Sequence, residues 1–215
     1  ISYSQELYQI REAMDFFRAN KLQSGDWSGF LTESDIEGSP YLNDEFITGN
    51  IYTSSKMQFA SVPLRFNIYS DQLEFKTPEG AIQAMAAPEI VEKVEFGEYK
   101  MVYIPYSNFK KIKNGFFKVV EEGKASLYAR CEIVFKKAEE PGAYKEAEPA
   151  KFVRNPDSYY IRVGLEQAKK VGNKKDLPEI FPDKRDKIAA FVKKNKIKTN
   201  KPEDLIQLVQ YYSSL

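Results

Sequence analysis

The stretch from Val62 to Lys76 most constrains the fold, because two runs of alternating apolar and polar residues flank a short polar break. The apolar members are Leu64, Phe66 and Ile68 before the break and Leu73 and Phe75 after it. Successive side chains of a strand point to opposite faces, so a period of two predicts a β-hairpin with one buried face. We expect the interleaved residues Arg65, Asn67, Glu74 and Lys76 to lie in water. Since an isolated hairpin is not stable, other strands must extend the sheet.

Further short apolar runs, each bounded by Gly, Pro or a charged turn, indicate those additional strands. They cover residues 45–52, 57–62, 80–85, 90–96, 99–106, 115–120, 125–135 and 158–163, and Phe152 is expected to return to the sheet. Residues 136–150 are charged and interrupted by proline, so they predict a protruding loop. A long antiparallel meander of this kind must twist and curl, either closing into a barrel or leaving a concave face.

Apolar residues at helical spacing predict helices at both ends of the chain. The apolar stripes are Leu7, Ile10, Met14 and Phe17 within 5–20, then Ile188, Phe191 and Val192, and finally Leu205, Leu208, Val209 and Tyr212. Asn200 followed by Glu203 resembles a capping box for the last helix, with Pro202 in its first turn. The expected fold is therefore a single α+β, mainly β domain. Its parts are an N-terminal helix and loop (1–44), an antiparallel meander forming a strongly curved sheet or partly open barrel (45–163), and a packed helical pair (164–215).

Composition removes several classes of functional site. The chain has no histidine, which excludes His-based triads and zinc sites. Its net charge of +1 does not favour nucleic acid, and no apolar run approaches the roughly 20 residues that span a bilayer. The single cysteine, Cys131, lies on the apolar face of a predicted strand, which favours a buried structural role over a nucleophile. With no phosphate loop, serine elbow or dinucleotide fingerprint, we expect no catalytic residue, metal or cofactor.

An acidic segment is the one candidate for a cation site. It contains Glu33, Asp35, Glu37, Asp44 and Glu45, and carboxylate oxygens are the ligands that calcium prefers. Their spacing does not fit the twelve-residue calcium loop, so a solvated acidic loop is the favoured interpretation.

Lysines concentrate near the C-terminus and form the strongest local charge asymmetry. The basic residues are Lys169, Lys170, Lys174, Lys175, Lys184, Arg185, Lys187, Lys193, Lys194, Lys196, Lys198 and Lys201. Clustered cations attract anionic lipid headgroups or polysaccharide at short range. The favoured interpretation is the wet face of an amphipathic helix.

Aromatic residues are numerous, with 15 Phe, 14 Tyr and the single Trp27. Tyr52, Tyr69, Tyr103, Tyr106 and Tyr128 fall in predicted strands, where a concave sheet could use them to hold an apolar or sugar ligand. Core filling and cross-strand pairing are favoured over that role.

Four segments carry a resemblance: LNDEFITGNIY, VPLRFNIYSDQLEF, FFKVVEEGKASLYAR and DKRDKIAAFVKKNKIKTNKPEDLIQLVQYYSSL. Together they resemble a group of uncharacterised exported proteins of Bacteroidetes-type bacteria, over roughly Gly38 to the C-terminus. Such proteins are made with a cleaved signal peptide, which would account for a chain that starts at Ile1. The resemblance implies an exported chain, periplasmic or associated with the outer membrane, and implies no activity or site residues.

Three functional expectations follow. The first is a non-enzymatic envelope protein that binds a partner protein or a small apolar ligand on a concave sheet face. The second is a carbohydrate-active or other hydrolase that uses carboxylates and tyrosines alone. The third is a structural or adaptor protein that docks through the Lys-rich C-terminal helices.

Overall fold

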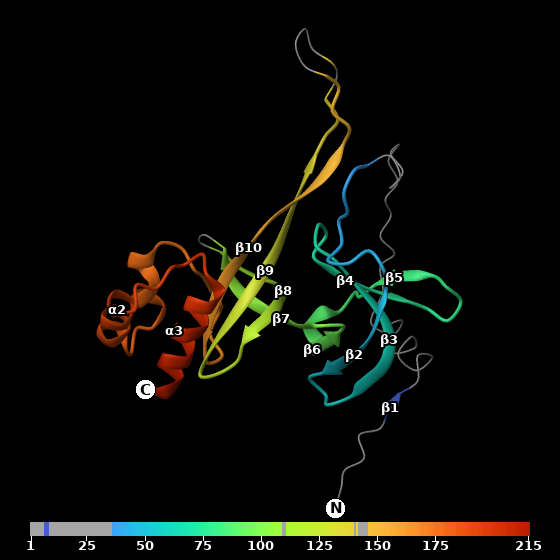
Figure 1. Ribbon diagram of the computed structural model, residues 1–215. Helices are drawn as coiled ribbons and strands as arrows, with labels where there is room; N and C mark the ends of the chain where they lie inside the picture. The colour runs from blue at the N-terminus through green and yellow to red at the C-terminus, as the bar shows by residue number, and fades with distance from the viewer. Residues whose placement is uncertain (1–6, 9–35, 109–110, 140, 142–145) are drawn as a thin grey trace, which may run out of the picture. The chain divides into compact units, whose positions relative to one another are not determined.

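The computed structural model describes residues 7–8, 36–108, 111–139, 141 and 146–215 (Figure 1). Its sheet is mostly antiparallel, which confirms the prediction from the alternating runs. The chain divides into two compact units: unit 1 takes residues 1–98 and 131–156, and unit 2 takes residues 99–130 and 157–215. Each unit is therefore built from two separated stretches of chain, while the single-domain organisation stays a prediction.

Unit 1 is an antiparallel sheet around the predicted hairpin. Its strands are β2 (Ile47–Thr53), β3 (Gln58–Asn67), β4 (Gln72–Lys76), β5 (Ile82–Ala84) and β6 (Val91–Phe96), with the short helix η2 (Pro88–Ile90) before β6. They lie in the order β6-β2-β3-β4-β5. Strand β1 (Leu7–Tyr8) pairs in parallel with β3, and the rest of the helix expected over 5–20 lies outside the described residues.

The hairpin of β3 and β4 has the predicted buried apolar face. Leu64 lies opposite Phe75 and Phe66 opposite Leu73, and all four side chains are buried. Burying each contributes about 1.5–3 kcal/mol. Asp71 has a φ of 56°, a left-handed conformation that Asp tolerates better than most residues, and it ends the polar turn.

The prediction for the other face of the hairpin was wrong for three of its four residues. Lys76 is exposed, but Arg65 and Glu74 lie opposite each other with 12% of each side chain exposed, and Asn67 is buried. The loop before β2 contacts this face, since its Tyr41 forms a backbone bridge with Asn67 and the Tyr41 ring lies 3.5 Å from the Arg65 guanidinium carbon. Alternation separates the two faces of a strand, but it does not say whether a distant segment covers both.

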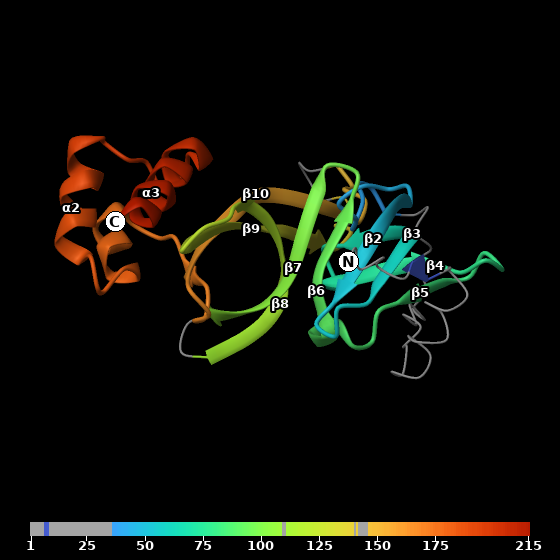
Figure 2. The ribbon, with the colours of Figure 1, turned by 90° about the horizontal axis from the view of Figure 1, so that it is seen from below.

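Unit 2 is a ring of strands. It contains β7 (Tyr99–Asn108), β8 (Lys111–Glu121), the first part of β9 (Ala125–Lys136), the last part of β10 (Lys151–Val163) and β11 (Lys169–Lys170), in the order β11-β10-β9-β8-β7. Ala168 bridges to Tyr106 in β7: its N–H donates to the Pro105 carbonyl and its carbonyl accepts from the Ser107 N–H, both at 2.9 Å. The strand path therefore returns to its first strand, and Figure 2 shows β7 to β10 curving round a common centre.

Aromatic side chains fill the ring. Phe117 and Tyr160 make an edge-on contact with ring centroids 5.0 Å apart, and Tyr106 and Tyr128 also contact Phe117 edge-on. Ring pairs in this arrangement add about 0.5–1.5 kcal/mol beyond their buried area. Tyr106 and Tyr128 are therefore core residues, which is the role that the sequence analysis favoured for them.

Three helical segments cover another part of unit 2: η3 (Lys174–Ile180), α2 (Arg185–Lys194) and α3 (Pro202–Ser214). The predicted apolar faces of α2 and α3 are buried, with Phe191 only half-buried. They share one core with the strands, made of Ala125, Leu127, Ile161, Leu177, Ile180, Phe181, Ile188, Val192, Ile197, Leu205, Leu208, Val209 and Tyr212. The helical pair is thus packed on the sheet, as predicted.

The predicted capping box was wrong. The N-cap of α3 is Lys201, which makes no side-chain capping bond, because the helix begins at Pro202. Instead the Asp204 carboxylate accepts the backbone N–H of Lys198 at 2.8 Å, which ties the preceding turn to the helix. Pro202 stands in the first turn as expected.

Strand β10 is longer than predicted, because it runs without a break through Pro156. In the segment predicted as a loop, Glu139 and Glu148 exchange both backbone hydrogen bonds at 2.8 and 3.0 Å, so antiparallel pairing extends beyond β9. Strand β11 and helix η3 were not predicted from the sequence. Within the described ranges, no helix has the length and apolar character needed to cross a bilayer.

Candidate functional site

A polar cluster lies at the covered face of the hairpin. The Arg65 guanidinium donates from Nε (3.2 Å) and Nη2 (2.8 Å) to the Glu74 carboxylate, and Asn67 donates to the same carboxylate at 3.3 Å. Nη1 donates to the backbone carbonyl of Asp44 at 3.2 Å. The Arg65 guanidinium carbon also lies 3.5 Å from the ring centroid of Tyr41. The cluster holds the loop before β2 against the sheet.

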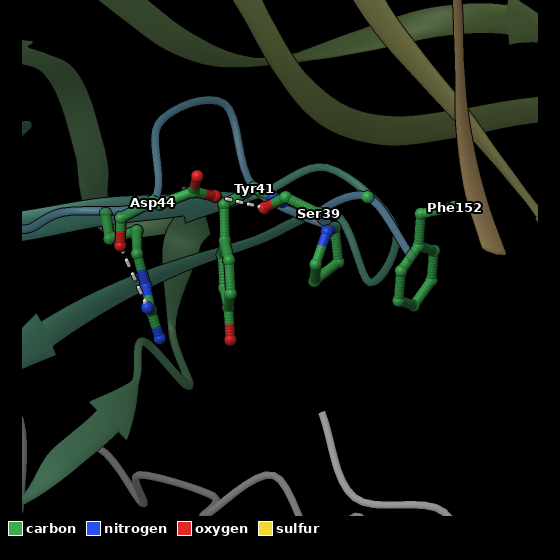
Figure 3. Close-up of a pocket in the computed structure, with 7 residues that line it drawn as sticks. Ser39, Tyr41, Asp44 and Phe152 are labelled. Atoms are coloured by element: carbon green, nitrogen blue, oxygen red, sulfur yellow. Dashed lines mark hydrogen bonds between the residues drawn. The ribbon is translucent and has the colours of Figure 1, made fainter. Parts of the chain in front are cut away.

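This loop forms one wall of a small cavity of about 260 Å³ (Figure 3). Its lining residues are Gly38, Ser39, Pro40, Tyr41, Asp44, Arg65 and Phe152. In Figure 3 the rings of Tyr41 and Phe152 extend to the same side of the loop, and Ser39 and Asp44 are hydrogen-bonded through their side chains. The Pro40 carbonyl accepts the Ile68 N–H at 2.8 Å, so the wall is fixed to β3.

Close backbone packing shapes the base of this cavity. Gly38 has a φ of +77°, and a Cβ added there would lie 2.5 Å from the Phe152 carbonyl oxygen. Only glycine fits this conformation and this approach. The Glu37 N–H donates to the Ala150 carbonyl at 2.9 Å, which joins the loop to the segment before β10.

The polar groups around the cavity stabilise the packing of the loop on the hairpin. Glu74 neutralises Arg65, so the guanidinium does not present an uncompensated charge to an anion. The volume lies below the roughly 300–1,000 Å³ of small-molecule sites, and a guanidinium lines it. The cavity therefore does not favour an apolar ligand at this position.

A second candidate is the basic surface, which we define as Lys187, Lys193, Lys194, Lys196, Lys198 and Lys201 on α2 and the turn before α3. All six side chains are exposed, and no acidic residue occurs between Lys187 and Lys201. No ion pair involves any of the six in the part of the chain that the structure describes. Arg185, by contrast, is paired with Glu179.

Backbone hydrogen bonds hold the turn between α2 and α3 that carries some of these lysines. The Ile197 N–H donates to the Val192 carbonyl and the Lys196 N–H donates to the Lys193 carbonyl, which is the bonding pattern of a Schellman motif. Ile197 and Val192 are both buried, and their burial anchors the turn on the core of unit 2.

One residue of the turn departs from the usual preference. Lys196 has a φ of +54°, at the position after a helix where glycine is the common residue. A lysine there costs about 1 kcal/mol of backbone strain, which its attraction to the helix C-terminus offsets in part. The sequence thus places a cation where a neutral glycine would fold more easily.

The basic surface faces outward from unit 2. Figures 1 and 2 both show α3 between α2 and the strands of this unit, so α2 is the outer helix. Its buried residues, Ile188 and Val192, point to the core, while Ala189 and Ala190 are exposed between the lysines.

No protein-family model, curated protein or solved structure matches the chain. The geometry of the chain itself is therefore what supports a function.

The other candidates from the sequence do not gather into a site among the described residues. Cys131 is buried, with 8% of its surface exposed, as predicted. Glu33 and Asp35 lie outside the described residues, and Glu37, Asp44 and Glu45 are exposed. No group of three carboxylate or thiol side chains that could hold a metal is found where the structure describes the chain.

The remaining aromatic candidates are also dispersed. Tyr69 is 45% exposed and contacts Phe152 edge-on at 5.3 Å, whereas Tyr52 and Tyr103 are half-buried. Trp27 lies outside the described residues.

Burial raises the pKa of two of the described tyrosines, Tyr159 and Tyr212. Burial raises the pKa of the Tyr212 hydroxyl above 10.0, and the hydrogen bond that it donates to Asp183 and the charge of that carboxylate raise it further. This interaction fixes α3 to the segment before α2.

Sequence reasoning missed the Arg65 cluster, whose one signal was the presence of opposite charges on the two strands of the predicted hairpin. The observed register is centred on Tyr69 and Ser70, one residue before the turn expected at Ser70 and Asp71, and it pairs Arg65 directly with Glu74. The contributions of Tyr41 to the cluster and of Phe152 to the cavity wall carried no such signal, because both come from distant segments.

Proposed function

We propose that this chain is an exported, non-enzymatic protein of the cell envelope that docks on an anionic envelope component through its basic surface. The observation that carries the proposal is the set of six exposed lysines on α2 and its hydrogen-bonded turn, which have no ion-pair partner among the residues that the structure describes. Export and an envelope location are supported by the resemblance to exported proteins of Bacteroidetes-type bacteria.

The favoured interpretation of these lysines from the sequence was a solvated helix face. Two observations favour docking instead. The lysines extend past α2 into the turn, where Lys198 and Lys201 are exposed. Lys196 occupies a strained position that glycine would fill at lower cost. A face that serves solubility alone needs neither feature.

The other two expectations stay predictions. A hydrolase needs two carboxylates about 5 to 10 Å apart across a cleft. An apolar ligand needs a concave apolar face, and the cavity beside Arg65 is small and lined by a charged group.

The test is binding of the purified full chain to washed cell envelopes of a Bacteroidetes-type bacterium, measured by sedimentation. The test variant replaces Lys187, Lys194 and Lys198 with Gln. The matched control replaces the exposed Lys76, Lys136 and Lys137 with Gln and has the same net charge.

We expect the wild type and the control variant to bind at about 0.01 M salt and to dissociate at about 1 M, since the Debye length falls from about 30 Å to about 3 Å. The test variant should bind weakly at either concentration. Equal binding by the test and control variants would refute docking through the basic surface.

A further inference from the structure

The basic surface presents a spread of positive charge. Its six lysines extend along α2, which is about 15 Å long, and through the turn. Acidic residues stand only at its ends: Asp186 precedes it, and Glu203 and Asp204 follow it. Asp204 is hydrogen-bonded to the Lys198 N–H and lies at the edge of the surface. The chain segment that carries the six lysines therefore contributes no negative charge between Lys187 and Lys201.

The kind of cation indicates what such a field recognises. Arginine binds a fixed carboxylate or phosphate through its planar fork, whereas lysine acts as a mobile point charge. All six cations of the basic surface are lysines, three on the outer helix α2 and three in the turn that follows it, and the one arginine of α2, Arg185, is paired with Glu179. This array fits many interchangeable anions in a plane better than one anion in a defined position.

The surroundings of the lysines disfavour other partners. Phe191 and Tyr211 stack on each other at 4.1 Å with an interplanar angle of 10°, and both are half-buried. They offer no exposed ring for a base, as single-stranded nucleic acid requires. Protein interfaces, in turn, are depleted of lysine at their centres.

The small residues of α2 set the depth of contact. Ala189 and Ala190 are the exposed apolar residues among the lysines of this helix. They let the helix approach an anionic surface closely, and they supply too little apolar area for insertion into the acyl chains. Binding of this kind stays at the level of the headgroups and depends on ionic strength.

We infer that the anionic component bound by the basic surface is the phospholipid headgroup layer of a bilayer. This inference rests on the proposed function and names its partner. Each lysine near an anionic membrane surface strengthens binding by about fivefold. Loss of three lysines should therefore weaken binding by about a hundredfold.

The experiment uses the full chain with vesicles of phosphatidylglycerol and phosphatidylcholine, compared with vesicles of phosphatidylcholine alone. The expected result is salt-sensitive binding to the anionic vesicles only. The variant with Gln at Lys187, Lys194 and Lys198 should bind about a hundredfold more weakly. The control variant with Gln at Lys76 and 136–137 should bind like the wild type.

Lack of binding to anionic vesicles, or equal binding to both compositions, overturns the inference. The same holds if the test variant binds anionic vesicles as tightly as the control. Circular dichroism of each variant verifies that the fold is retained, which is expected because the substituted lysines are exposed.

The envelope assay separates failure of this inference from failure of the proposed function. A chain that binds washed envelopes through the basic surface but ignores anionic vesicles retains the proposed function and refutes a lipid partner. Binding that survives detergent extraction of the lipid then assigns the partner to anionic polysaccharide or protein. A chain that binds neither preparation refutes both.

Discussion

Replacing Glu74 with Ala should destabilise unit 1 more than any loss of an exposed ion pair. The Glu74 carboxylate accepts three hydrogen bonds, two from Arg65 and one from Asn67. Its removal leaves the Arg65 guanidinium at a site where 12% of the side chain is exposed, with no carboxylate to balance its charge.

The magnitude follows from this burial. Breaking a fully buried ion pair costs about 3–5 kcal/mol, and the rings of Tyr41 and Phe46, at 3.5 and 4.5 Å from the guanidinium carbon, still stabilise the cation. We therefore expect the free energy of unfolding to fall by about 3 kcal/mol. The double variant Arg65→Met with Glu74→Leu should stay within about 1 kcal/mol of the wild type, because an apolar pair leaves no buried charge.

The assay is urea unfolding of the full chain followed by circular dichroism, with equal m-values required for the comparison. The matched control is Glu92→Ala, which removes a 2.7 Å pair with Lys56 whose side chains are 48% and 77% exposed. That control should cost less than about 0.5 kcal/mol. If Glu74→Ala costs no more than the control, the polar cluster does not brace the hairpin.

Three further predictions concern single positions. Lys196→Gly should raise the free energy of unfolding, measured in urea, by up to about 1 kcal/mol, because glycine adopts the left-handed φ without strain. The same substitution should weaken vesicle binding about fivefold, because it removes one positive charge. A lower free energy of unfolding would refute the strain at this position. Gly38→Ala should lower the free energy of unfolding by about 2 kcal/mol in the same urea assay, because the added Cβ would meet the Phe152 carbonyl oxygen. An unchanged urea midpoint would contradict the close packing of Gly38 against Phe152. Burial and the Asp183 carboxylate raise the pKa of Tyr212, and the stability that this shift contributes is complete below pH 10 and is lost as pH rises through the folded-state pKa. Tyr212→Phe should therefore flatten the alkaline loss of stability, and identical pH profiles would refute the raised pKa.

Local alternation was enough to predict much of the sheet. The hairpin of β3 and β4 and the strand around Cys131 follow from a period of two, which a strand expresses within its own residues. Both C-terminal helices are likewise predicted by apolar residues at intervals of three and four. Pro156 hid the continuity of β10 between Phe152 and the predicted strand 158–163, and Pro178 hid η3, because proline argues against both strand and helix.

The two candidate sites also differ in how far the sequence predicted them. The lysines of the basic surface were visible in the sequence, but whether they pair with acids within the described part of the chain depends on where η3 and α3 place their carboxylates. Tyr41, whose ring lies against Arg65, and Phe152, which lines the same cavity, stand 24 residues before and 87 residues after Arg65 in the chain. Contacts over such separations are decided by tertiary packing and leave no local pattern.

The interleaving of the two units bears on how the chain folds during synthesis. Unit 1 lacks its second stretch until residue 156 has been made, and unit 2 until the chain is complete. A nascent chain that ends near Arg130 would hold the start of β9 without β10, with an unpaired edge open to other chains. Neither unit can be released by one cut as a continuous fragment, so proteolysis at an exposed turn should leave two pieces that stay associated until they are denatured.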